Sequence, residues 1–165
     1  MTLWQPGMRI TDARLNDAPP FTVEFAAITA NTATTTTTET VGITTAPITF
    51  RTGRAYRITL KCLAQSSVSG DNMMLRVRKT DTSGTAYIDQ IRVQILAAGA
   101  NCPIYFSNIC ANTTGADVTA VLVATYLRNV GSGNAFIAAS VNNVAFVHVE
   151  DLGDAADYPS ATAIT

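Results

Sequence analysis

The sequence predicts an all-β fold, an antiparallel β-sandwich of about eight to ten strands with jelly-roll-like connections. Three observations lead to this prediction. Apolar and polar residues alternate with a period of two along most of the chain. Turn-forming residues recur roughly every 8–12 positions, as they do between short strands, and no stretch has the apolar spacing of an ordinary helix. With 165 residues, 47% of them hydrophobic and 14% charged, the chain is long enough for one domain with a substantial core.

The strongest strand signal covers residues 54–66, where apolar side chains recur at every second position from Tyr56 to Ala64 and Arg57, Thr59 and Lys61 lie between them. Cys62 falls on the apolar face, so we expect it to be a small buried core residue. Residues 73–78 and 86–95 alternate in the same way, and the turn at 81–84 between them predicts a hairpin.

Two shorter strands are expected nearer the N-terminus, at 21–29 and 39–45. Between them lies the Thr-rich segment 32–40. Polythreonine favours extended backbone but buries little surface, so this segment is expected to form an extended edge or a linker.

The second half of the chain continues with strands at 104–110, 118–127, 136–141 and 144–150. The strand at 118–127 is apolar on both faces. Such a strand is buried on both sides, by the core on one and by a partner or a loop on the other. Three of its residues are candidates for a subunit interface: Val121, Val123 and Leu127.

The domain is therefore expected to occupy residues 21–150, between an arm at 1–20 and a tail at 151–165. The tail is acidic and has no strand pattern. The first 17 residues hold the only tryptophan of the chain but too few apolar side chains for a core of their own. This segment is expected to be a docking arm, although the tryptophan could instead fold back onto its own domain. The residues that would dock are Trp4, Pro6, Gly7, Met8, Ile10, Leu15 and Asn16.

The same segment lacks the basic start, apolar run and cleavage site of a signal peptide, and no stretch of the chain is long and apolar enough to span a membrane. A net charge of −1 gives no bulk attraction to nucleic acid or to an acidic membrane. The charge is uneven, with +5 over residues 51–92 and −4 over residues 93–165. Pairing between neighbouring strands is the simpler explanation, and complementary edges between subunits are the alternative.

No arrangement of residues points to catalysis, and we expect no enzymatic activity, cofactor or metal. The three cysteines show no zinc-ligand spacing, and an odd count without a secretion signal favours free thiols, although Cys102 and Cys110 could bridge. His148 is the only histidine and is not accompanied by a nucleophile motif, so a structural role is favoured over a hydrolase site. The acidic pairs Glu150–Asp151 and Asp154–Asp157 lack the arrangement of a glycosidase or of a calcium loop.

The N-terminal segment resembles the opening of small structural proteins of tailed bacteriophages and prophages, notably those of actinobacteria. The matching positions are Trp4, Gly7, Ile10, Thr11, Ala13, Leu15 and Asn16. Residues 149–159 are similar to the ending of uncharacterised virion proteins of actinobacterial phages, and the two matches together cover about a sixth of the chain.

The resemblance implies a virion component, assembled in the cytoplasm of the bacterial host and attached through its arm to major capsid or tail proteins. It also makes a homotrimer a reasonable expectation, and capsid decoration is favoured slightly over a minor tail protein. The main alternative is a module that binds carbohydrate on the host surface. That role usually needs exposed aromatic residues, which make up only 7% of this chain.

Overall fold

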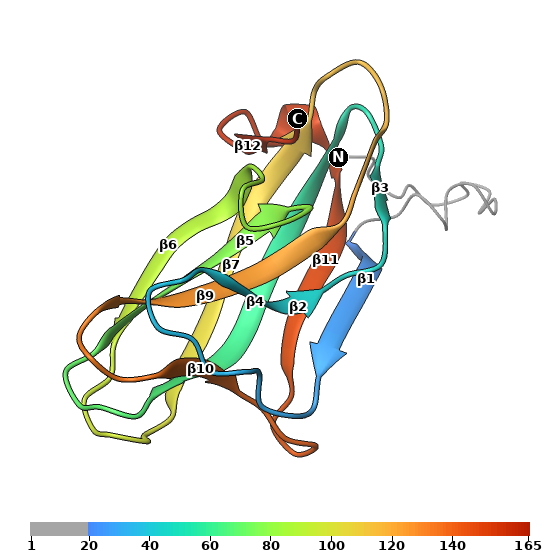
Figure 1. Cartoon of the computed structure of the whole chain (residues 1–165). Coiled ribbons are helices and arrows are strands. Elements are labelled where there is room, and N and C mark those ends of the chain that lie inside the picture. Colours follow the sequence, from blue (N-terminus) through green and yellow to red (C-terminus); the bar gives the residue numbers. More distant parts are fainter. Residues whose placement is uncertain (1–19) are drawn as a thin grey trace.

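The computed structural model describes residues 20–165, which form an antiparallel β-sandwich (Figure 1). The predicted all-β, jelly-roll-like fold class is confirmed. The docking residues predicted between Trp4 and Asn16 lie outside the described residues. In the described part of the chain, one 3-10 turn, Ala155–Asp157, is the only helical element, and no helix there is long and apolar enough to cross a membrane.

The larger sheet is built around β4, the segment with the strongest alternation in the sequence. Its strand order is β1-β11-β4-β7-β12. β4 pairs with β7 along one side, and with β11 and β10, one after the other, along its other side. The short β12 pairs parallel with β7, and the other pairs are antiparallel. The strands are β1 (Phe21–Ile28), β4 (Arg54–Ser66), β7 (Cys102–Asn112), β10 (Ala135–Ala138), β11 (Ala145–Asp154) and β12 (Thr162–Ala163).

The second sheet has four antiparallel strands in the order β2-β9-β5-β6 and lies against the first. The predicted hairpin is its β5–β6 pair. A separate two-stranded pair, β3 with β8, adjoins these sheets. The strands are β2 (Thr40–Thr44), β5 (Asn72–Lys79), β6 (Ala86–Gln94), β9 (Leu122–Val130), β3 (Ile48–Phe50) and β8 (Val118–Ala120).

The core fills the space between the two sheets and consists of the inward-facing residue of each alternating pair. The face of β4 that the sequence identified as apolar is buried, including Cys62 at 1% exposure. The inward-facing residues of β5 and β9 in the smaller sheet are buried against this face. The largest fully buried side chains include Tyr56, Ile58, Leu60, Leu75, Leu122 and Tyr126.

The strand expected over 118–127 is interrupted at Val121. β8 pairs with β3, whereas β9 pairs with β2 and β5, so the chain changes partners at this point. The backbone carbonyl of Val121 instead accepts a hydrogen bond from the Thr80 amide at 2.8 Å. β3 was not expected from the sequence, because three residues following Pro47 give no usable periodicity.

The end of the strand pattern at Glu150 was predicted wrongly, and residues 151–165 are part of the fold. β11 continues to Asp154 through a bulge at Leu152, the residue skipped between Asp151 and Gly153 in the pairing with β4, and the φ of +108° at Gly153 suits glycine. Ile164 is fully buried in the core, and its amide donates to the Ala111 carbonyl at 2.8 Å. The bulge shifts the alternation by one residue, so the sequence pattern is lost where the strand itself continues.

Candidate interaction surfaces

The predicted interface strand is covered on its outer face largely by the chain itself. Val123 is 2% exposed in the single chain, and Val121 and Leu127 are half-buried. The sequence left two possibilities for burying this strand, a partner subunit or a loop of the same chain. Val123 is already buried within the single chain and needs no partner. Thr125, between Val123 and Leu127, is fully buried.

Glu39 contacts the outer face of this strand at Thr125, and no sequence motif identified it. Its carboxylate accepts hydrogen bonds from Arg76 Nη1 at 2.7 Å, Arg78 Nε at 2.8 Å and Thr125 Oγ1 at 2.6 Å. Arg76 Nε also donates to Asp89 at 2.7 Å. Burial by itself raises the pKa of Glu39, but the hydrogen bonds from Arg78 and Thr125 and the two guanidinium charges outweigh it, so the pKa lies below its ordinary value.

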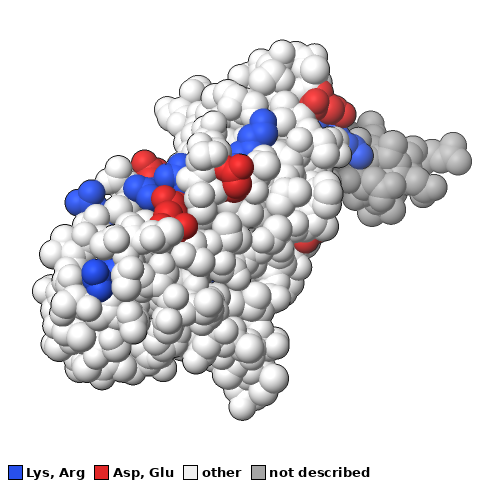
Figure 2. All heavy atoms as spheres, in the orientation of Figure 1, with Lys and Arg blue, Asp and Glu red and all other residues white. Residues whose placement is uncertain are grey.

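The uneven charge along the sequence is neutralised in part within the fold. Arg54 and Arg57 on β4 pair with Asp151 and Glu150 on β11, at 2.8 and 3.4 Å. These pairs join the basic and acidic halves of the sequence, as the simpler explanation predicted. On the face shown in Figure 2, basic and acidic groups lie beside one another and most of the surface is uncharged.

The outer face of the larger sheet carries an aromatic cluster. Strand pairing places Phe25 opposite His148, and Phe146 and Tyr105 on the two sides of Lys61. The ring centroids of Phe25 and Phe146 are 5.0 Å apart. Phe25 and Tyr105 are 51% and 75% exposed. We call these four aromatic side chains, Phe25, Tyr105, Phe146 and His148, the aromatic face.

His148 connects two strands on this face. Its Nε2 lies 2.9 Å from Thr22 Oγ1, and its ring meets that of Phe25 edge-on at 5.7 Å. These contacts fit the structural role predicted for it. Within residues 20–165, no group of three or more His, Cys, Asp or Glu side chains is placed to hold a metal ion.

The three cysteines are free thiols, as predicted. Cys62 and Cys110 are buried, and Cys102 is half-buried. Burial raises the pKa of both Cys62 and Cys110 to about 12. These two thiols therefore stay protonated and unreactive near neutral pH.

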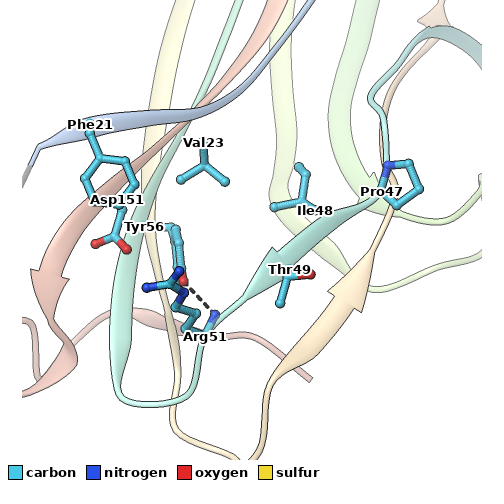
Figure 3. A pocket seen from close by; sticks show the side chains of 8 residues that line it. All are labelled: Phe21, Val23, Pro47, Ile48, Thr49, Arg51, Tyr56 and Asp151. Atoms are coloured by element: carbon cyan, nitrogen blue, oxygen red, sulfur yellow. Dashed lines mark hydrogen bonds between the residues drawn. The ribbon is translucent and has the colours of Figure 1, made fainter. Parts of the chain in front are cut away.

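A cavity of about 250 Å³ opens where β1 begins, between that strand and β3 (Figure 3). The Asp151 carboxylate and the Arg51 side chain also line it. Tyr56 lines the cavity as well, and its hydroxyl oxygen accepts a hydrogen bond from the Arg51 backbone amide at 2.6 Å. We call this cavity the β1 pocket; its apolar lining residues are Phe21, Val23, Pro47 and Ile48.

The sequence did not identify the β1 pocket. Its lining residues come from positions 21–23, 47–56 and 151, which only the fold brings together. Phe21 and Val23 could be recognised as apolar strand residues, but nothing in the sequence shows that they are left partly uncovered.

Comparison with known proteins supports the fold assignment. No protein-family model matches the chain, and no curated protein matches it. Among solved structures, it is similar to the VP2 subviral particle of infectious bursal disease virus, with a TM-score of 0.52, 13% identity, and coverage of 85% of this chain and 34% of that one. A structure of the Gx strain of the same virus gives a TM-score of 0.50, 16% identity, and coverage of 87% and 34%. The chain thus spans about a third of the length of these solved chains, and the likeness shows that they share its sandwich fold.

Proposed function

We propose that the chain is a non-enzymatic structural component of the virion of a tailed phage, attached by its N-terminal arm and displaying the β-sandwich on the particle. The observation that carries this proposal is the fold, which is similar over 85% of the chain to that of VP2 in a subviral particle. The phage-like residues of the arm, from Trp4 to Asn16, support it independently.

Capsid decoration is the favoured location, with a minor tail protein as the alternative. The receiving surface would belong to a major capsid or tail protein, and the virion would be assembled in the bacterial cytoplasm. Surface complementarity is the proposed mechanism, in which the apolar arm side chains Trp4, Met8, Ile10 and Leu15 fill a site on the particle.

A homotrimer is part of the same proposal. Val121 and Leu127 retain surface for a subunit contact, whereas Val123 contributes almost none. Light scattering on the purified chain measures the mass directly. A trimer supports this part of the proposal, and a monomer at all concentrations removes it.

The test of attachment is incorporation into particles. Deletion of residues 1–17 is expected to leave a folded β-domain that no longer sediments with the virion, and Trp4→Ala is expected to reduce incorporation. Far-UV circular dichroism checks the fold of each variant. Normal incorporation of the folded deletion variant would contradict attachment by the arm, and antibody labelling of the wild-type particle distinguishes head from tail.

The aromatic face favours a second function, recognition of carbohydrate on the host surface. Aromatic rings offer flat apolar surfaces, and Phe25 and Tyr105 are half-exposed or more. They stand three strand spacings apart on β1 and β7, about 14 Å across the sheet, and are offset by two residues, about 7 Å, along the strands. Glycan-array binding that Tyr105→Ala abolishes and Val141→Ala preserves would support this function, because Val141 is equally exposed, at 77%, but lies off the aromatic face.

A further inference from the structure

We propose that, in the free protein, the β1 pocket holds the indole of Trp4 from the same chain. The inference concerns the protein before assembly, so it stands or falls separately from attachment to a particle. Three features of the pocket lead to it: its size and apolar walls, its polar groups, and the place where the N-terminal segment joins the domain.

The pocket has room for one large side chain and not for a folded segment. Its volume is about 250 Å³. Phe21 and Val23 from β1 form one wall, and Pro47 and Ile48 at the start of β3 form the other (Figure 3). Ile48 is already 2% exposed, so the floor belongs to the core, whereas Pro47 is exposed at the mouth. A bulky apolar group in this space would extend the core outward.

The polar groups of the pocket favour a neutral hydrogen-bond donor. The Asp151 side chain is 3% exposed, and its Oδ1 accepts from Arg54 Nη2 and from the Gly153 amide, both at 2.8 Å. Within residues 20–165, its Oδ2 accepts only from Arg54 Nε, at 3.1 Å, so it has room for another donor. The positive charge of Arg51, which lines the pocket, disfavours a cationic side chain. The matching ligand is an apolar body with one uncharged N–H.

An indole has that chemistry, and Trp4 is the only tryptophan of the chain. The other bulky apolar residues of the N-terminal segment have no side-chain donor: Met1, Leu3, Met8, Ile10 and Leu15. They could fill the apolar part of the pocket but would leave the acceptor at Asp151 unused.

The connection makes weak binding sufficient. The N-terminal segment joins the domain immediately before Phe21, which itself lines the pocket. Fully extended, the ~17 residues from Trp4 to Phe21 would span about 56–61 Å, so the segment is long enough to bring Trp4 to the pocket. A tether of this length gives an effective concentration of the indole in the millimolar range, so an intrinsic affinity of about 1 mM is enough for substantial occupancy.

Because Trp4 is the sole tryptophan, its fluorescence reports the occupancy of the pocket in the full-length chain. The probe variant is Thr49→Arg, which places a long side chain at the mouth from an exposed position. The matched control is Thr119→Arg on β8. Thr119 is also exposed and contacts Thr49 through their hydroxyls at 3.3 Å, but it does not line the pocket. Both variants lose that contact, and only one obstructs the pocket.

We expect wild type and Thr119→Arg to show blue-shifted emission and at least threefold weaker acrylamide quenching than a peptide of residues 1–17. Thr49→Arg is expected to emit and quench like the peptide. Circular dichroism checks the fold, and Pro47→Arg, also at an exposed lining position, replaces Thr49→Arg if that variant fails to fold.

Three results would overturn the proposal. Wild-type emission equal to that of the peptide would show that the indole is in water. Shielding that survives in Thr49→Arg and in Pro47→Arg would place it elsewhere. Shielding that grows with protein concentration, together with a larger mass in light scattering, would assign the indole to the pocket of a second copy.

Discussion

Glu39 is expected to be the strongest electrostatic contributor to the stability of the smaller sheet, and Glu39→Gln tests this. Gln retains one acceptor oxygen but removes the charge between Arg76 and Arg78. Arg76 keeps Asp89 at 2.7 Å, and Arg78 keeps the Gly84 carbonyl at 2.9 Å, so neither guanidinium is left without a partner.

The magnitude follows from burial. Exposed ion pairs contribute about 0–1 kcal/mol, and breaking a fully buried pair costs about 3–5 kcal/mol. The side chains of Glu39, Arg76 and Arg78 are 18%, 14% and 17% exposed, closer to the buried limit. We expect a loss of about 2–3 kcal/mol in the free energy of unfolding, or about 5–10 °C in Tm for a chain of this size.

Urea and thermal denaturation followed by circular dichroism measure this loss at several pH values. The pKa of Glu39 is lowered in the folded state from 4.5, so its contribution is complete above that value and disappears as the pH falls through the folded pKa. The difference between wild type and Glu39→Gln should therefore be constant near neutrality and shrink below about pH 4.5. The control, Asp89→Asn, removes a 51% exposed partner of Arg76 and should cost less than about 1 kcal/mol. A loss below about 0.5 kcal/mol at pH 7, or one that does not shrink in acid, would refute the reasoning.

Three further predictions concern the larger sheet and its edge. Asp151→Asn is expected to lower the free energy of unfolding by about 3 kcal/mol in urea denaturation, because Arg54 loses a partner that is only 3% exposed; an unchanged urea midpoint would contradict this. Ile164→Ala is expected to lower the free energy of unfolding by about 2–4 kcal/mol in the same assay, since the Ile164 side chain is fully buried. No change in that free energy would indicate that residues 151–165 are a tail after all. Thiol labelling at pH 8, followed by mass spectrometry, should modify Cys102 in the native chain and all three cysteines after unfolding, whereas rapid native labelling of Cys62 or Cys110, whose thiols have a pKa of about 12, would show that the core opens.

Strand positions were predicted best from the sequence where one face of the strand packs on the core and the other faces solvent. The strand at 54–66 was predicted with the boundaries of β4, because apolar residues occupy every second position from Tyr56 to Ala64. The hairpin at 73–95 was found for the same reason. Periodicity failed at two places. At Val121 the chain changes partner strands, and at Leu152 an extra residue forms a bulge, so the pattern shifts there with no change in composition.

The interaction surfaces were less predictable because they depend on which strands become neighbours. Glu39 meets Arg76 and Arg78 only because β2 and β5 both pair with β9. The aromatic face likewise needs β1 and β7 on either side of β11 and β4. An aromatic content of 7% argued against such a face, but the fold gathers these few rings on one side of the sheet.

The strand order of the larger sheet also affects how the chain folds during synthesis. β1 has β11 as its hydrogen-bonded neighbour in this sheet, and ~120 residues separate Ile28 from Ala145. At about 5–20 residues per second, the ribosome needs roughly 6–24 s to make that interval. During this time β1 and one side of β4 have unpaired backbone, which invites association with other nascent chains. The larger sheet is therefore completed only as the last residues of the domain leave the ribosome, and soluble yield should rise when the expression level is lowered, because fewer incomplete chains are then present to associate.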